Sequence, residues 1–509
     1  MKTILSLALL SALVGSSEAG GVTSRLQVHI PKTLTRDKGY DHREALFGVP
    51  PYGGSIQQTV YYADQDLCDS NVDTTKGFPE RKDGGHWPSP YILMVDRGDC
   101  TFVRKVRNAQ RSGAAGVIIA DNKCLCSAGD KCKPDDAEEV CEMKEPIMAD
   151  DGSGSDISIP SFLMFKEDAD PIREVLKQNK MVRMEMTWAI PKEDNRVEYD
   201  LFTTPTDSIS RPFQDQFKAA ALALGKHAKF TPHMYIYDGI KAGCQGFDGE
   251  NQCYNLCTNN GRYCATDPDD DLDSGISGAD VVTESLRRAC IWKIYGADGV
   301  GEKWWTYVEE FMYRCQEEDY FMSDDCINDV YVHAGVVKGD VDACMLDSGG
   351  LEGDESNSVL EAQLGEREAS GVVIIPSMYV DTAAIRGALE FSTVFKAVCA
   401  GYTSNTEPEV CKKCANCLDE YGCVVQGKCT AGGVSGIKSG VTPEAFAGTL
   451  GVMVFIFCIA GFIQWRRTQS QMRNQVRGIM AEYMPLDKRQ AMGDHDTSVG
   501  LSEGDGEFS

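Results

Sequence analysis

The fold is decided by residues 91–121, which read YILMVDRGDCTFVRKVRNAQRSGAAGVIIAD. The first six residues form an apolar run typical of a buried strand, and residues 116–121 form a second one. Between them, a tight turn at Arg97-Gly-Asp-Cys100 leads into a predicted helix over 101–112, which Gly113 ends. Strand, helix and strand in this order predict an α/β domain.

This unit belongs to a predicted first domain of residues 28–191. A turn-rich segment over 47–55 precedes the first strand, and an apolar run over 159–164 returns the chain to the core. Residues 124–154 carry four cysteines and many acidic residues. That composition is typical of a surface insertion tied by disulfides.

A second domain is predicted over 195–405, with a helical, cysteine-rich insertion at 244–365. Its strands are predicted at 197–202, 232–237 and 371–380. Its helices are predicted at 212–226, 281–295 and 304–314. A terminal helix carries apolar residues at helical spacing, namely Phe391, Val394, Phe395, Val398 and Cys399. This order is thioredoxin-like. Pro376 is the candidate for the cis-proline that such folds place beside their active site. A redox enzyme would need Cys-x-x-Cys after the second strand, where the segment offers only Cys244.

The two ends of the chain predict a single-pass type I membrane protein. Residues 1–19 read as a secretory signal peptide. After a Gly/Ser-rich stalk at 430–444, a transmembrane helix is predicted over 445–465. The arginines that follow place the tail, residues 466–509, in the cytosol. Within it, Tyr483, Met484, Pro485 and Leu486 have the form of a signal that a clathrin adaptor binds as an extended peptide.

Cysteine usage agrees with this topology. The chain has 21 cysteines, and all except Cys458 lie between Cys68 and Cys429, on the predicted luminal side. An oxidising lumen favours disulfides, so the Cys-x-x-Cys-x-x-Cys run is assigned to disulfides over zinc or redox chemistry. Residues 411–429 are predicted to be a truncated EGF-like segment. The named disulfide candidates are Cys68, Cys100, Cys411, Cys414, Cys417, Cys423 and Cys429.

The net charge of −27 argues against nucleic acid and anionic membrane surfaces as partners. It is compatible with cationic peptides or calcium, and equally with the ordinary acidic surface of a secretory-pathway ectodomain. The acidic run at 267–273 resembles a calcium loop, but Ser274 and Asp280 depart from the EF-hand pattern. Calcium therefore stays a possible cofactor, and no metal ligand set is assigned.

His-Glu-x-x-His and Gly-x-Ser-x-Gly motifs are both missing from the sequence. No catalytic residue is assigned, and the protein is predicted not to be an enzyme. Because there is no Asn-x-Ser/Thr sequon, no N-glycosylation is expected.

Arg97 is the strongest candidate for binding. It lies on the turn before a helix, where a guanidinium can offer a fork of donors to a peptide carbonyl or carboxylate. The alternative is that Arg97 only pairs with Asp99 to hold the turn. The residues alone favour neither interpretation.

Several segments together resemble the vacuolar sorting receptors. They are Arg97-Gly-Asp-Cys-Thr-Phe102, Asn108-Ala-Gln110, Ala120-Asp-Asn122, Val197-Glu-Tyr-Asp-Leu201, Thr231-Pro-His233, Gly261-Arg-Tyr-Cys-Ala-Thr-Asp-Pro268 and the tail segment Ile479-Met-Ala-Glu-Tyr-Met-Pro-Leu-Asp487. The resemblance implies a multidomain α/β protein with a protease-associated domain, a thioredoxin-like domain, EGF-like repeats, one membrane span and a short tail. It also implies that Arg97, with Asp99 beside it, contacts the cargo peptide.

The function that the resemblance implies is that of a cargo receptor. Such a receptor binds sorting signals on soluble vacuolar or lysosomal proteins in the Golgi lumen and carries them through prevacuolar or endosomal membranes. Its tail binds the medium subunit of a clathrin adaptor, and cargo leaves in a more acidic compartment, where His86 is a candidate switch.

The alternative function is that of a membrane-tethered thioredoxin-like oxidoreductase or chaperone. A protease-associated ubiquitin ligase would need zinc-binding cysteines in the tail, which has none. The reduced EGF-like part and the extra four-cysteine insertion depart from the family pattern.

Overall fold

The computed structural model describes residues 24–63, 66–69, 90–134, 140–191, 195–247, 249–372 and 374–429. Within these ranges, no helix combines the length and apolarity needed to cross a bilayer. The predicted signal peptide, stalk, transmembrane helix and tail, including the Tyr483 signal, lie outside the described residues, and so does His86.

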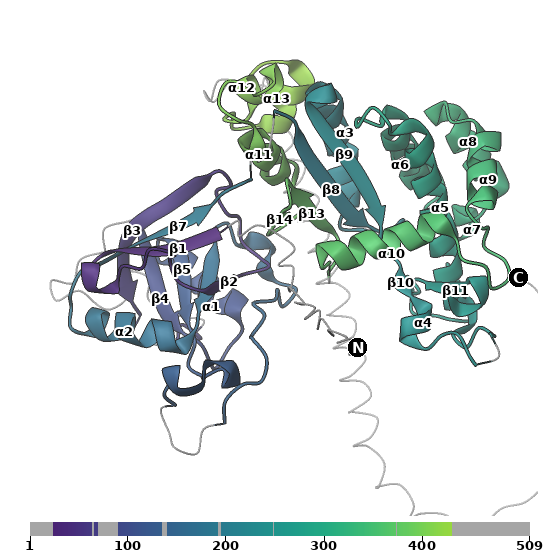
Figure 1. Ribbon diagram of the computed structural model, residues 1–509. Coiled ribbons are helices and arrows are strands. Elements are labelled where there is room, and N and C mark those ends of the chain that lie inside the picture. Colours follow the sequence, from purple (N-terminus) through teal and green to yellow (C-terminus); the bar gives the residue numbers. More distant parts are fainter. Residues whose placement is uncertain are drawn as a thin grey trace, which may run out of the picture. The chain divides into compact units, whose positions relative to one another are not determined.

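The first domain is a seven-stranded sheet with a helix on each face (Figure 1). Its strand order is β1-β7-β3-β4-β5-β6-β2, and β3, β4, β5 and β6 run parallel to one another. The elements are β1 (Ser24–Ile30), β2 (His42–Glu44), β3 (Gly54–Tyr62), β4 (Tyr91–Asp96), α1 (Phe102–Arg111), β5 (Ala114–Ala120), β6 (Ser161–Met164), α2 (Lys166–Lys177) and β7 (Val182–Trp188). The strand–helix–strand prediction for residues 91–121 is confirmed.

Both faces of the central strands are buried, which explains why they read as unbroken apolar runs. Successive side chains point to opposite faces. In β4, Leu93 and Val95 pack in the core that contains Val106 of α1. Ile92 and Met94 pack in the opposite core with Ile172 of α2.

The edge strand β2 carries a half-buried histidine. The centre of the His42 ring lies 4.2 Å from that of Phe162, with the two rings tilted by 37°. Its Nδ1 lies 2.9 Å from the carbonyl oxygen of Tyr40, and its Nε2 lies 2.9 Å from Oγ of Ser24. Burial lowers the pKa of His42 below its ordinary value, and the hydrogen bond to the carbonyl oxygen of Tyr40 offsets this only in part. The folded domain therefore disfavours a proton on this ring.

We expect the domain to lose stability as the pH falls below about 6.5, the ordinary histidine pKa. In that range the unfolded chain binds a proton at residue 42 that the folded chain does not, so the free energy of unfolding decreases. His42→Gln should show a smaller loss between neutral and mildly acidic pH in urea unfolding.

The second domain is built on a four-stranded sheet of order β14-β13-β8-β9. Strands β8 and β9 are parallel, and β13 runs antiparallel to β8 and β14, which is the thioredoxin-like arrangement. Its elements are β8 (Val197–Thr203), α3 (Arg211–Leu224), β9 (Ala228–Met234), β13 (Ser377–Val380), β14 (Ala383–Ile385) and α11 (Phe391–Gly401). Residues 371–376, predicted as strand, lie outside β13, and β14 was not predicted.

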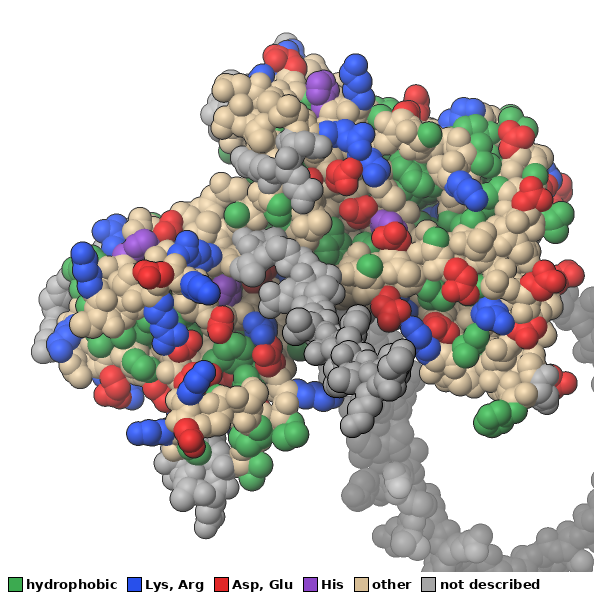
Figure 2. Space-filling model, in the orientation of Figure 1, with side chains coloured by type: hydrophobic (Ala, Val, Ile, Leu, Met, Phe, Trp, Pro, Cys, Tyr) green, Lys and Arg blue, Asp and Glu red, His purple; other side chains and the backbone are tan. Residues whose placement is uncertain are grey.

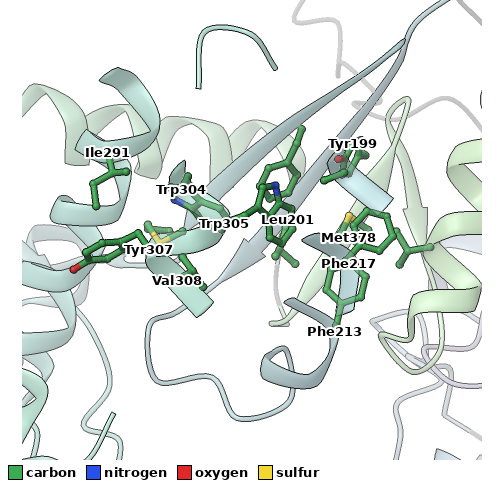
Figure 3. Close-up of a cluster of buried hydrophobic side chains, with 14 of the residues drawn as sticks. Tyr199, Leu201, Phe213, Phe217, Ile291, Trp304, Trp305, Tyr307, Val308 and Met378 are labelled. Atoms are coloured by element: carbon green, nitrogen blue, oxygen red, sulfur yellow. The ribbon is translucent and has the colours of Figure 1, made fainter. Parts of the chain in front are cut away.

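A helical insertion separates β9 from β13, as the sequence predicted. It contains β10 (Tyr237–Asp238), α4 (Gly239–Ala242), β11 (Cys257–Thr258), β12 (Tyr263–Cys264), α5 (Gly278–Tyr295), α6 (Glu302–Arg314), α7 (Glu318–Phe321), α8 (Asp324–Ala334), α9 (Lys338–Asp347) and α10 (Ser358–Ser370). Figure 3 shows how Trp304 and Trp305 connect this insertion to the sheet. The Phe230 ring of β9 lies 4.4 Å from that of Trp305 and 5.3 Å from that of Trp304.

The prediction of an EGF-like segment at 411–429 is wrong. The segment forms two short helices, α12 (Glu409–Cys414) and α13 (Glu420–Gln426), which pack in the core of the thioredoxin-like domain through Cys411, Cys414, Cys417 and Cys423. A disulfide joins Cys411 to Cys399 at the end of α11, so the segment extends that domain. The cysteine spacing alone did not distinguish a helical arrangement from an EGF-like one.

Candidate functional site

The site is formed where two neighbouring parallel strands end. Strand β4 ends at Asp96 and is followed by Arg97, whereas β5 ends at Ala120 and is followed by Asp121. Because the strands are parallel and adjacent, both residues lie at the same edge of the sheet. The backbone N–H of Arg97 donates to the carbonyl oxygen of Ala120 at 2.9 Å, which fixes the start of the turn against β5.

Asp121 is the buried anchor of the site. Its side chain is fully buried, and its Oδ1 accepts from Nη1 of Arg97 at 3.0 Å and from the backbone N–H of Lys123 at 3.2 Å. Its other oxygen, Oδ2, is buried and has no hydrogen-bond partner among the described residues. A buried carboxylate needs a cation, so Asp121 holds the guanidinium of Arg97 at this edge.

The second partner of Arg97 is Glu142. Nη1 donates to Oε2 at 2.8 Å and Nη2 to Oε1 at 3.0 Å, which is the parallel two-bond geometry of a strong arginine–carboxylate pair. Burial lowers the pKa of Arg97, but the hydrogen bond to Glu142 and the charge of Asp121 outweigh it, so the pKa rises above its ordinary value. The side chains of Arg97 and Glu142 remain 22% and 23% exposed, so the pair is accessible to solvent.

Asp99 is not brought to Arg97. Among the described residues, the ion pairs of Arg97 are to Asp121 and Glu142. Asp99 is exposed on the turn, where it adopts a φ of 60°. The interpretation in which Arg97 only pairs with Asp99 to hold the turn is therefore wrong.

The turn is held by other groups. Cys100 forms a disulfide with Cys68, and Nδ2 of Asn108 on α1 donates to the carbonyl oxygens of Leu67 and Asp69 at 2.8 and 3.0 Å. These contacts fasten the turn to residues 66–69 and to the start of α1. Thr101 caps that helix, because its side chain accepts from the backbone N–H of Arg104.

A second cation lies at the same edge. Arg173 of α2 pairs with Asp96 at 2.9 Å and with Asp170, and its Nη2 lies 3.5 Å from the carbonyl oxygen of Asp121. Arginines and carboxylates thus alternate along the strand ends. Figure 2 likewise shows Lys and Arg interspersed with Asp and Glu over the visible face. Because charges of both signs are mixed, we expect a charged ligand to bind through individual groups such as Arg97.

Glu142 was missed by sequence reasoning. It lies within the four-cysteine insertion, which has disulfides Cys124–Cys132 and Cys126–Cys141. The only signal for it was its position next to Cys141, together with the observation that the insertion departs from the family pattern. Because Glu142 lies 45 residues from Arg97 in sequence, local patterns did not connect the two.

In the thioredoxin-like domain, the Ile375–Pro376 peptide bond is cis. Cys244 follows α4 at the expected redox position, but it is disulfide-bonded to Cys253 and only 3% exposed. The neighbouring Cys257–Cys264 disulfide is buried as well. The arrangement offers no accessible thiol pair among the described residues.

Ten disulfides join all twenty cysteines from Cys68 to Cys429, which confirms the predicted disulfide bonding. The named candidates pair as Cys68–Cys100, Cys399–Cys411, Cys414–Cys423 and Cys417–Cys429. Two groups of cysteines are close enough to share a metal ion, but each sulfur belongs to a disulfide. In the acidic run at 267–273, the side chains of Asp267, Asp269 and Asp271 each accept from the backbone N–H two residues on, which makes a series of turns.

Comparison with known proteins matches both domains to family models. Residues 56–172 match the PA domain, and residues 197–399 match the vacuolar sorting receptor thioredoxin-like domain. The chain is 33% identical over 446 residues to vacuolar-sorting receptor 4 of Arabidopsis thaliana, covering 82% of this chain and 66% of that relative. It is also 33% identical over 395 residues to vacuolar-sorting receptor 1 of Pisum sativum, covering 73% of this chain and 58% of that relative. The chain thus spans less than two thirds of the length of these relatives.

Proposed function

The chain belongs to the vacuolar sorting receptor family, and from this premise we propose that it is a cargo receptor of the secretory pathway. It binds sorting signals on soluble proteins in the Golgi lumen and delivers them to a vacuole or lysosome-like compartment. It spans the membrane once, and its tail recruits a clathrin adaptor through Tyr483 and Leu486. Its compartments are the Golgi, trans-Golgi vesicles and prevacuolar or endosomal membranes.

The observation that carries the proposal is the placement of Arg97. The residue lies on a turn held by a disulfide and by Asn108, and its guanidinium is anchored from below by the buried Asp121. It is still 22% exposed, so it can present charged donors to a peptide. A pre-organised donor at the end of a rigid sheet lowers the entropy lost on binding.

The competing function is that of a thioredoxin-like oxidoreductase. Its chemistry requires a thiolate that can attack a substrate disulfide, and such thiolates are partly exposed. Cys244 is buried, and its partner Cys253 lies nine residues away in sequence rather than three. These properties support a structural role for the disulfide and a receptor without enzymatic activity.

The function can be tested through the tail. In cells whose native chain is replaced by the Tyr483→Ala variant, we expect the receptor to accumulate at the cell surface or in a terminal compartment. We also expect soluble vacuolar proteins to appear in the medium, because Tyr483 is proposed to fill an adaptor pocket. Quantitative imaging and proteomics of the medium measure the two effects.

Met484→Ala is the matched control. In the sequence, Met484 stands between the two proposed anchor residues, at a position to which the proposal assigns no adaptor pocket, so that variant should sort like the parent. If Tyr483→Ala leaves both the receptor and its cargo where the parent does, this segment is not the main sorting signal.

A further inference from the structure

The strongest unexplained feature of the site is that its arginine already holds a ligand from the same chain. Glu142 binds the guanidinium of Arg97 through both carboxylate oxygens, at 2.8 and 3.0 Å. The positive charge of Arg97 already has a partner in the buried carboxylate of Asp121. Glu142 adds a second carboxylate, which also lies 4.0 Å from Nζ of Lys123, so Arg97 keeps a carboxylate partner in Asp121 when Glu142 moves away.

Glu142 is held in this position by its backbone. Its N–H donates to the carbonyl oxygen of Cys124 at 2.8 Å, and its carbonyl oxygen accepts from the N–H of Cys126 at 2.9 Å. The preceding residue, Cys141, is disulfide-bonded to Cys126. We name these residues, 124–126 and 141–142, the clasp. Because the clasp is fixed by two hydrogen bonds and a disulfide, the carboxylate is presented to Arg97 with little loss of entropy.

Three residues that flank Glu142 in the sequence are apolar and exposed. Val140 is 81% exposed, Met143 is 87% exposed and Ile147 is 69% exposed. A peptide whose carboxylate replaces that of Glu142 would meet these exposed apolar side chains with its own apolar residues. A small free carboxylate such as acetate could not use them.

We propose that Glu142 occupies the position on Arg97 that a carboxylate of the cargo peptide takes, so that cargo must displace Glu142 in order to bind. This inference rests on the proposed receptor function and names the chemical class of its ligand, a peptide that carries a carboxylate beside apolar residues. Because Arg97 and Glu142 are each more than a fifth exposed, water can compete for the pair and the exchange is accessible. Asp121 remains bound throughout and keeps Arg97 in place.

The size of the effect follows from the fraction of time that Arg97 is free. If Glu142 leaves it for about 1–10% of the time, removing the carboxylate raises the apparent affinity for peptide about tenfold to hundredfold. Glu142→Gln keeps the size and shape of the side chain but removes its charge. Glu145→Gln is the matched control, because Glu145 lies nearby in sequence but pairs with Arg43.

The experiment uses the full chain purified in detergent and three fluorescent pools of random hexapeptides. One pool has a free C-terminal carboxylate and no acidic residue, the second has a C-terminal amide and one Asp or Glu, and the third has an amide and no acidic residue. Fluorescence anisotropy measures binding of each pool to the parent, Glu142→Gln, Glu145→Gln and Arg97→Ala/Glu142→Gln. Acetate is added as the competitor that represents a small carboxylate.

We expect Glu142→Gln to bind at least one carboxylate-containing pool about tenfold to hundredfold more tightly than the parent, with the third pool unchanged. The gain should vanish in Arg97→Ala/Glu142→Gln, and Glu145→Gln should match the parent. Comparison of the first two pools tells whether the carboxylate comes from the chain end or from a side chain. Equal gains for all three pools, no gain for any pool, or full competition by acetate would each overturn the proposal.

A second variant displaces Glu142 without changing its charge. Cys126→Ala/Cys141→Ala removes the disulfide of the clasp, so we expect a gain in peptide affinity in the same direction and smaller. If the affinity is unchanged both in this variant and in Glu142→Gln, displacement of Glu142 by cargo is rejected.

If soluble luminal proteins bind through Arg97 equally well in the parent and in Glu142→Gln, the receptor function stands and only the role of Glu142 fails. If no luminal protein binds either chain, the receptor function itself fails.

Discussion

Replacing Arg97 with Ala should weaken binding of soluble cargo about tenfold to hundredfold, because the change removes charged hydrogen bonds that contribute about 1.5–3 kcal/mol. The measurement is titration of a cargo protein, captured from the lumen of the same cells, against residues 24–429 of the parent and the variant. Arg104→Ala is the matched control, because Arg104 is an exposed arginine on the neighbouring helix α1. It should bind cargo like the parent.

The same change affects the fold, so it needs a second variant. Arg97→Ala leaves the fully buried Asp121 without its cation, and an uncompensated buried charge is strongly destabilising. Arg97→Ala/Asp121→Asn removes both charges and should restore most of the thermal stability, but not the affinity for cargo. If the double variant is folded and binds cargo as tightly as the parent, Arg97 does not contact cargo.

Replacing Glu284 with Ala should lower the free energy of unfolding by about 3–5 kcal/mol, because it leaves two buried arginines without their anion. Glu284 on α5 is fully buried and pairs with Arg287 and, at 2.9 Å, with Arg288. Its two oxygens also accept from the hydroxyl of Tyr307 at 3.2 and 3.3 Å. The pKa of that hydroxyl is raised well above its ordinary value, by burial and then by the charge of Glu284, so Tyr307 stays a donor.

Urea unfolding followed by tryptophan fluorescence measures this loss, because Trp304 and Trp305 lie in the same core as Tyr307. Glu310→Ala is the matched control. It breaks the ion pair of Glu310 with Arg314, which also spans four residues of a helix but is partly exposed. Such pairs contribute about 0.3–0.5 kcal/mol. Similar losses in the two variants would show that the buried network does not stabilise the helical insertion.

The sequence predicted the parts of the fold that have strong local patterns. Residues 91–121 gave the strand–turn–helix–strand unit because both strands are buried on two faces and therefore read as continuous apolar runs. In the second domain, the order of elements around Pro376 was sufficient for a thioredoxin-like arrangement. The short strand β14 was missed because three residues carry too little periodicity to be recognised.

The candidate site was predicted only in part, for a physical reason. Arg97 was found from its turn and from the family resemblance, but its partners come from two other segments. Asp121 follows the adjacent parallel strand, so strand order could have placed it beside Arg97. Glu142 depends on how two disulfides fold the insertion, and disulfide connectivity cannot be read from cysteine spacing. For the same reason, 411–429 was assigned to an EGF-like segment instead of two helices.

The most direct test of the receptor function compares secretion with binding. Soluble luminal proteins are captured on immobilised residues 24–429 and identified, and the secreted fraction of each is then measured in cells with and without this chain. The receptor function predicts that the captured proteins, and not other luminal proteins, move into the medium when the chain is deleted. If the captured proteins remain in their compartment as before, the chain is not their sorting receptor.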